Sequence, residues 1–271
     1  MEPRARMSSA PPLAAGSRAA VRLFCIPYAG GSASPYQPWR KVLPPLIDVD
    51  PVSLPGRDAR IGEPPLRAMG SAVDALVGEL FPRIDRPFVF FGHSMGALLA
   101  YEVARRAEEA GLPLVGLLAS GAPAPHLHAR SRDLHALPDA ELVQELRRLG
   151  GTPREALENP ELMALVLPTL RADFELCETY RHRAGPPLGC PVHVFGGLGD
   201  EGVPREDLEA WRALTSASFR LRMLPGGHFF LHESETLLTH MLARDVVELL
   251  SQSKHALEMG TALGWGARRN R

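Results

Sequence analysis

The chain has 271 residues, of which 45% are hydrophobic and 23% charged, and its formal net charge is −1 at pH 7. This fits one large globular domain, and the near-neutral charge argues against a basic surface that would recruit nucleic acid or a membrane. Its 3 cysteines, Cys25, Cys177 and Cys190, are too scattered for a disulfide framework or a paired-cysteine metal site, so we expect a reducing, cytoplasmic compartment.

The two ends of the chain are expected to be disordered tails, at residues 1–18 and 253–271. The first combines Arg with Ala, Pro and Ser and lacks the apolar run of a secretory signal. No stretch approaches the about 20 apolar residues of a transmembrane helix. We therefore expect no targeting segment and no membrane association.

Between these ends, short apolar runs alternate with longer helical stretches. Strands are predicted over 21–28, 48–54, 87–91 and 114–120, and helices over 70–84 and 94–110. After residue 187 the predicted elements are strands 191–195 and 219–224 and helices 206–214 and 237–250. This alternation is typical of a mainly parallel sheet with helices on both faces. We predict a single α/β domain over residues 1–271.

Residues 126–187 interrupt the alternation with helical patterns only. An amphipathic helix is predicted from Pro138 to Leu149, with Gly150 as its stop. A second helix is predicted to start at Asn159-Pro160 and to be interrupted by Pro168. We interpret this segment as a helical lid inserted over the carboxyl edge of the sheet.

The most informative motif is Gly-His-Ser-Met-Gly at residues 92–96, which lies between a predicted strand and a predicted helix. In this setting a G-x-S-x-G sequence is the nucleophile elbow of the α/β-hydrolase fold, where a sharp turn lifts the serine hydroxyl above the sheet. Both glycines are needed because a Cβ at either position would collide with neighbouring backbone. We therefore predict an α/β-hydrolase fold with Ser94 as nucleophile.

This fold places an acid and then a histidine after the serine, because the hydroxyl needs a base and the base needs an orienting carboxylate. His228 follows two glycines just past strand 219–224, at the sheet edge where Ser94 is expected. Of the chain's 10 histidines it is the only one placed in this way, so we predict that it is the base.

The candidate acid is Asp200, which directly follows the glycine-rich turn after strand 191–195. Glu201 lies one step further on, and the preceding strand is followed by no carboxylate until Asp133. The alternative is that Asp200 only caps the helix near Pro204. We predict that Asp200 orients the histidine.

An oxyanion hole requires two backbone N–H groups directed at the developing charge. Met95 follows the nucleophile at a helix N-terminus, and the loop 28–31 after the first strand offers Ala29 beside two glycines. We predict that these two amides form the hole. The alternative for the loop is a simple turn.

Together these motifs resemble the type II thioesterases of modular polyketide and nonribosomal peptide pathways. The resemblance runs from about Arg22 to Leu250 and rests on residues 26–32, 54–57, 92–96, 199–200 and 226–230. It implies a Ser-His-Asp thioesterase that hydrolyses aberrant or stalled acyl groups from the phosphopantetheine arm of acyl carrier domains, through an acyl-serine intermediate. Acyl carrier domains are then the expected partners, with no cofactor and no metal.

Three weaker signals support no separate function. His126, His128 and His135 lack a cysteine or a fourth ligand and favour a solvated stretch over a metal site. Cys190 is an unsuitable nucleophile, because it begins a strand and does not lie in a nucleophile elbow. Six arginines in or beside the insertion favour carrier docking and a plain solvated surface equally; they are Arg130, Arg132, Arg147, Arg148, Arg181 and Arg183.

Three alternative functions stay open. A carboxylesterase or lipase-like hydrolase on this fold would process free esters and show no preference for carrier-bound thioesters. A non-catalytic binding protein is disfavoured by the intact set of Ser94, Asp200 and His228. A cyclising thioesterase commonly carries its acid after the earlier strand, where this chain has none.

Overall fold

The computed structural model describes residues 19–128, 133–152 and 154–262. It contains a six-stranded sheet in the order β2-β1-β3-β4-β5-β6, in which every neighbouring pair is parallel. The strands are β1 (Val21–Ile26), β2 (Ile47–Pro51), β3 (Phe88–His93), β4 (Leu114–Ser120), β5 (Val192–Gly197) and β6 (Phe219–Leu224). The predicted parallel sheet is thus confirmed. The strand order reverses between β1 and β3, and such a switch point opens a crevice at the carboxyl ends of the strands.

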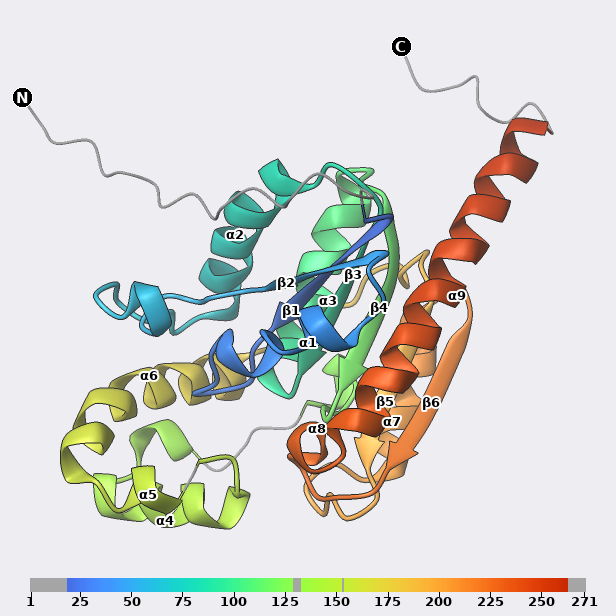
Figure 1. The fold of residues 1–271 in the computed structure, drawn as a ribbon. Coiled ribbons are helices and arrows are strands. Elements are labelled where there is room, and N and C mark those ends of the chain that lie inside the picture. The colour runs from blue at the N-terminus through green and yellow to red at the C-terminus, as the bar shows by residue number, and fades with distance from the viewer. Residues whose placement is uncertain (1–18, 129–132, 153, 263–271) are drawn as a thin grey trace, which may run out of the picture.

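Helices cover both faces of the sheet (Figure 1). They are α1 (Trp39–Val42), α2 (Met69–Leu80), α3 (Met95–Glu109), α7 (Arg205–Glu209), α8 (Phe230–Glu233) and α9 (Glu235–Ala262). Because side chains alternate along a strand, neighbouring residues enter different cores. Phe90 packs in the core with α2 and α3, whereas Phe91 packs in the core with α1 and α9. This two-sided burial explains why the strands read as continuous apolar runs.

The insertion between β4 and β5 contains α4 (Asp139–Leu149), α5 (Arg154–Leu157) and α6 (Pro160–Thr179). It lies at the carboxyl ends of the strands (Figure 1) and has a small apolar core of its own. The prediction that Pro168 interrupts a helix is wrong, because α6 continues through it. Proline removes one backbone hydrogen bond there, but the apolar packing of Leu167 and Leu170 on either side keeps the helix in place.

Several element ends differ from the predictions. The predicted helix 70–84 ends as α2 at Leu80 and continues as a 3₁₀ turn over Phe81–Arg83. Helix α9 continues to Ala262 and so reaches into the segment expected to be a tail. The rest of that tail and the expected tail at 1–18 lie outside the described residues. Within the described part of the chain, none of the helices combines the length and the apolar character needed to cross a bilayer.

Candidate active site

Ser94 lies in a strained turn between β3 and α3. Its φ of 52° and ψ of −118° are unfavourable for a residue with a side chain. Its N–H donates to the carbonyl of Ser120 at 2.7 Å. A Cβ on Gly92 would lie 2.0 Å from the carbonyl oxygen of Gly96, and one on Gly96 would lie 2.3 Å from that of Ile26. The two glycines therefore allow the close approach that this turn requires.

Asp200 and His228 form a hydrogen-bonded pair across the loops that follow β5 and β6. His228 Nδ1 lies 2.7 Å from Asp200 Oδ2, and Asp200 Oδ1 accepts the N–H of Gly202 at 3.0 Å. Since an ionised carboxylate can only accept, Nδ1 donates and Nε2 is left to act as a base. The helix-capping alternative does not apply, because the N-cap of α7 is Pro204 and no side chain caps it.

The glycine loops that carry this pair lie against each other. The N–H of Gly199 donates to the carbonyl of Gly226 at 2.9 Å, and a Cβ on Gly197 would lie 2.3 Å from the carbonyl oxygen of Gly227. Backbone therefore meets backbone at the point where the acid and the histidine are brought together.

The two amides predicted for the oxyanion hole border the same cavity as Ser94. Met95 is the first residue of α3, where backbone N–H groups lack helical partners and favour negative charge. Ala29 lies in a turn closed by a hydrogen bond of 2.8 Å from the N–H of Gly31 to the carbonyl of Tyr28. Gly30 provides the positive φ, 69°, that this turn needs.

A cavity of about 430 Å³ extends from this site into the insertion. Ser94, Met95, Ala29 and His228 line one part of it. The insertion contributes mostly apolar side chains, among them Leu146, Leu149, Leu162, Val166, Leu170 and Phe174. The arrangement therefore suits an apolar chain whose reactive carbon lies at the serine.

His93, which sequence reasoning did not assign a role, packs against His228 of the hydrogen-bonded pair. It is completely buried, its Nδ1 lies 2.9 Å from Ser120 Oγ, and its ring centroid lies 5.2 Å from that of His228. Burial, reinforced by His228 and His232, lowers the pKa of His93 well below its usual value. His93 is therefore a neutral packing residue that supports the His228 loop.

Tyr28 connects the loop after β1 to the segment that follows His228. Its hydroxyl lies 3.0 Å from Nε2 of His232, and its ring packs edge-on against Phe229 with centroids 5.2 Å apart. The two partners lie just after His228, so Tyr28 links the loop at 28–31 to the loop that carries His228. Sequence spacing gives no sign of this contact.

Arg57 and Asp173 form a second feature that the sequence reasoning missed. Arg57 Nη2 lies 2.7 Å from Asp173 Oδ1, and Nη1 lies 2.9 Å from Oδ2. The two residues are only 6% and 1% exposed. Arg57 belongs to a motif behind the family resemblance, but nothing in the sequence pairs it with a residue of α6.

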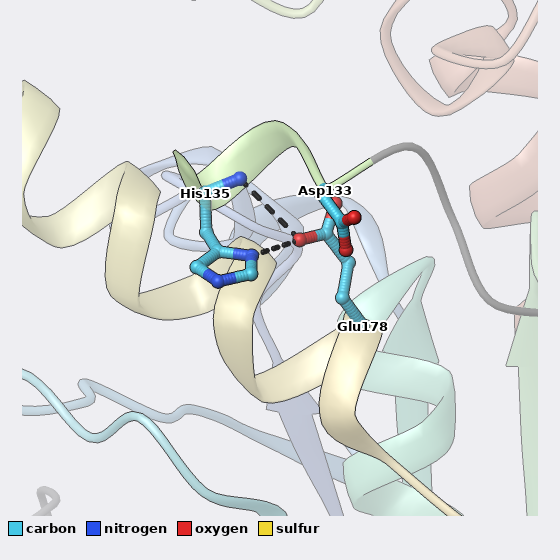
Figure 2. A group of neighbouring side chains, drawn as sticks. All are labelled: Asp133, His135 and Glu178. Carbon is cyan, nitrogen blue, oxygen red and sulfur yellow. Dashed lines mark hydrogen bonds and ion pairs between the residues drawn. The ribbon is translucent and has the colours of Figure 1, made fainter. Parts of the chain in front are cut away.

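Asp133, His135 and Glu178 place possible metal-binding atoms within 4.8 Å of one another (Figure 2). However, Glu178 accepts the backbone N–H of Leu134 at 2.7 Å and that of His135 at 3.3 Å, and it also contacts the His135 ring. These contacts fix the turn at 134–136 onto α6, so the fold itself accounts for the cluster. His128, from the predicted histidine group, instead contacts a backbone carbonyl of α6 at 2.9 Å.

The insertion's arginines differ in their surroundings. Arg148 pairs with Glu145 at 2.9 Å, whereas Arg181 Nη1 donates to the carbonyl of Tyr180 at 2.6 Å. Arg130 and Arg132 lie outside the described residues.

Comparison with known proteins gives matches that cover most of the chain. The family model described as thioesterase domain matches residues 21–245. The gramicidin S biosynthesis protein GrsT of Aneurinibacillus migulanus is 43% identical over 231 residues, covering 85% of this chain and 90% of GrsT. LgrE of Brevibacillus parabrevis, named linear gramicidin dehydrogenase, is 46% identical over 227 residues, covering 82% of this chain and 86% of LgrE. The solved structure of YbtT, a type II thioesterase from the yersiniabactin NRPS/PKS pathway, has a TM-score of 0.77 at 33% identity and covers 88% of this chain and 97% of YbtT.

Proposed function

This chain belongs to the thioesterase domain family, and from that membership and the geometry of the site we propose that it is an editing thioesterase. Its substrates are aberrant or stalled acyl groups on the phosphopantetheine arm of acyl carrier domains in polyketide or nonribosomal peptide biosynthesis. The observation that supports the proposal is that Ser94 and His228 line the same largely apolar cavity, while His228 is hydrogen-bonded to Asp200. The pathways named for GrsT and YbtT support the biosynthetic setting.

In the proposed reaction, Ser94 Oγ attacks the thioester carbonyl while His228 Nε2 accepts its proton. The amides of Ala29 and Met95 donate to the oxyanion. The tetrahedral intermediate then expels the thiol, which receives the proton from His228, and leaves an acyl-Ser94 ester. Water attacks this ester with His228 as base, and collapse releases the carboxylic acid and returns the proton to Ser94. Asp200 keeps the imidazole in the required tautomer throughout.

Two alternative activities, those of a carboxylesterase and of a dehydrogenase, require different groups in the site. A carboxylesterase would use the same chemistry but gain nothing from a carrier domain. A dehydrogenase, the activity in the name of LgrE, exchanges hydride with a redox cofactor such as a nicotinamide and does not need a serine nucleophile. The strained turn at Ser94 and the carboxylate-oriented His228 are the groups that acyl transfer needs, and they favour hydrolysis.

The test compares one acyl group on three carriers: an acyl carrier domain, a small thiol such as N-acetylcysteamine, and an alcohol as a free ester. We expect the highest kcat/KM on the carrier domain, release of free acid, and no consumption of NADPH. Ser94→Ala should abolish both hydrolysis and labelling by a fluorophosphonate. Hydrolysis that survives Ser94→Ala would contradict the mechanism, and equal rates on the free ester and the carrier would favour the esterase.

A further inference from the structure

One turn of α6 contacts two loops, the one at 28–31 that contains Ala29 and the one at 54–57 that contains Arg57. Thr169 Oγ1 donates to the carbonyl of Gly56 at 2.8 Å, and Asp173 Oδ2 accepts the N–H of Gly30 at 2.7 Å. Between them, Leu170 packs so closely on Gly30 that a Cβ there would lie 2.3 Å from Leu170 Cδ2. The insertion is therefore seated directly on the turn that contains Ala29.

Arg57 completes this connection from the other side. Its Nη1 donates to the carbonyl of Gly31 at 3.0 Å while its guanidinium makes the bidentate contact with Asp173. The pair thus engages the N–H of Gly30 and the carbonyl of Gly31, two consecutive residues of the turn. Charge-assisted bidentate contacts of this kind fix orientation as well as distance.

These contacts set the direction of the Ala29 amide. The N–H of Gly31 donates to the carbonyl of Tyr28 at 2.8 Å. That carbonyl and the N–H of Ala29 belong to the same planar peptide unit, so a rotation of one rotates the other. Fixing Gly30 and Gly31 therefore fixes the plane in which the Ala29 N–H points.

Stability alone is a poor explanation for such a buried pair. Desolvation of two charges roughly cancels their attraction, and well-packed apolar residues are often equally stable or more so. Burial raises the pKa of Asp173 even though Arg57 opposes the shift. What the pair adds over an apolar contact is the direction of its hydrogen bonds.

We infer that Arg57 and Asp173 are positioning residues that hold the Ala29 amide toward the oxyanion and make its placement depend on helix α6. This inference rests on the proposed function, in which Ala29 is an oxyanion donor. It implies that the insertion supports transition-state stabilisation in addition to lining the acyl cavity.

The test uses two variants and two inhibitors. Asp173→Asn weakens the pair, and the double variant Arg57→Met with Asp173→Leu removes both charges together so that none is left unpaired. An acyl trifluoromethyl ketone reports on the oxyanion, because Ser94 adds to it and forms a tetrahedral alkoxide. The matching acyl thioether reports on acyl binding alone. Asp245→Asn is the control, because the buried carboxylate of Asp245 forms a bidentate contact with the partly exposed Arg222 (2.6 and 3.1 Å) between α9 and β6.

For each variant that titrates with fluorophosphonate, we expect kcat/KM to fall about 10- to 100-fold and the trifluoromethyl ketone to weaken by a similar factor. The thioether should bind within about threefold of wild type, and the control should match wild type per titrated site. Unchanged kcat/KM in the double variant would overturn the inference. So would equal weakening of both inhibitors, which would mean that the pair shapes the acyl cavity. Failure of the proposed function would instead appear in wild type, as absent hydrolysis or labelling.

Discussion

The substitution Asp200→Asn tests the proposed catalytic role of the Asp200–His228 pair through the hydrogen bonds that Asp200 makes. Oδ1 of Asp200 accepts the N–H of Gly202 at 3.0 Å, and Oδ2 accepts from His228 Nδ1 at 2.7 Å. An asparagine has only one side-chain oxygen, and the backbone N–H of Gly202 can only donate to it. The new NH₂ group must therefore face His228 and donate to Nδ1.

Donation to Nδ1 forces the imidazole proton onto Nε2. In that tautomer His228 has no lone pair to accept the proton of Ser94, although every atom keeps its place. The corresponding substitution in a serine protease lowers kcat about 10⁴-fold, which is about 5 kcal/mol in the activation free energy. We expect a loss of this size here, with unchanged thermal stability to within a few degrees.

The assay is steady-state hydrolysis of an acyl-N-acetylcysteamine thioester, normalised to correctly folded protein. Glu201→Gln is the matched control, because Glu201 is the exposed carboxylate directly after Asp200 in the chain. It should retain wild-type kcat within about twofold, since the side chain is solvated. Activity of Asp200→Asn within tenfold of wild type, or an equal loss in Glu201→Gln, would refute the assignment.

Three further predictions concern the elbow, the cavity and the fold. Gly92→Ala should abolish folding or labelling by fluorophosphonate, because its Cβ would lie 2.0 Å from a backbone carbonyl oxygen; a normally labelled variant would contradict this. Leu146→Phe should shift the preferred acyl chain to shorter lengths, because Leu146 is buried and lines the cavity; an unchanged chain-length profile would argue that the acyl group binds elsewhere. Burial opposes ionisation of Asp245, but His193 and Arg222 hold its pKa well below the usual range. Its contribution to stability is therefore present above its unfolded pKa of about 3.9 and is lost as the pH falls through the lower folded pKa. Asp245→Asn should lower the free energy of unfolding by about 3–5 kcal/mol at pH 7 in urea titrations, with a smaller difference below about pH 4; a pH-independent difference would be inconsistent with this.

The sequence pattern predicted those features that depend on residues close together in the chain, such as strand ends and tight turns. Strands β4 and β6 begin and end at the predicted residues, because each is an apolar run bounded by clear turn signals. The glycines around Ser94 likewise indicate a close backbone approach that the structure contains. Pro168 misled the reading of α6 because a proline weakens a helix only locally, and tertiary packing of its neighbours can outweigh that loss.

Contacts between distant segments are the part that no local pattern encodes. Arg57 and Asp173 are 116 residues apart, and Tyr28 and His232 are 204 residues apart. Each pair joins a loop to a helix from a distant part of the chain, and the two meet only because the parallel sheet brings the carboxyl ends of its strands to one edge. Reacting groups must be recognisable by their immediate neighbours, since a nucleophile needs its turn and a base needs its glycine loop. Residues that orient those groups have no such local requirement, because any side chain that reaches from a neighbouring element can do so. The orienting contacts are therefore determined by the tertiary fold and not by the residues next to them in the sequence.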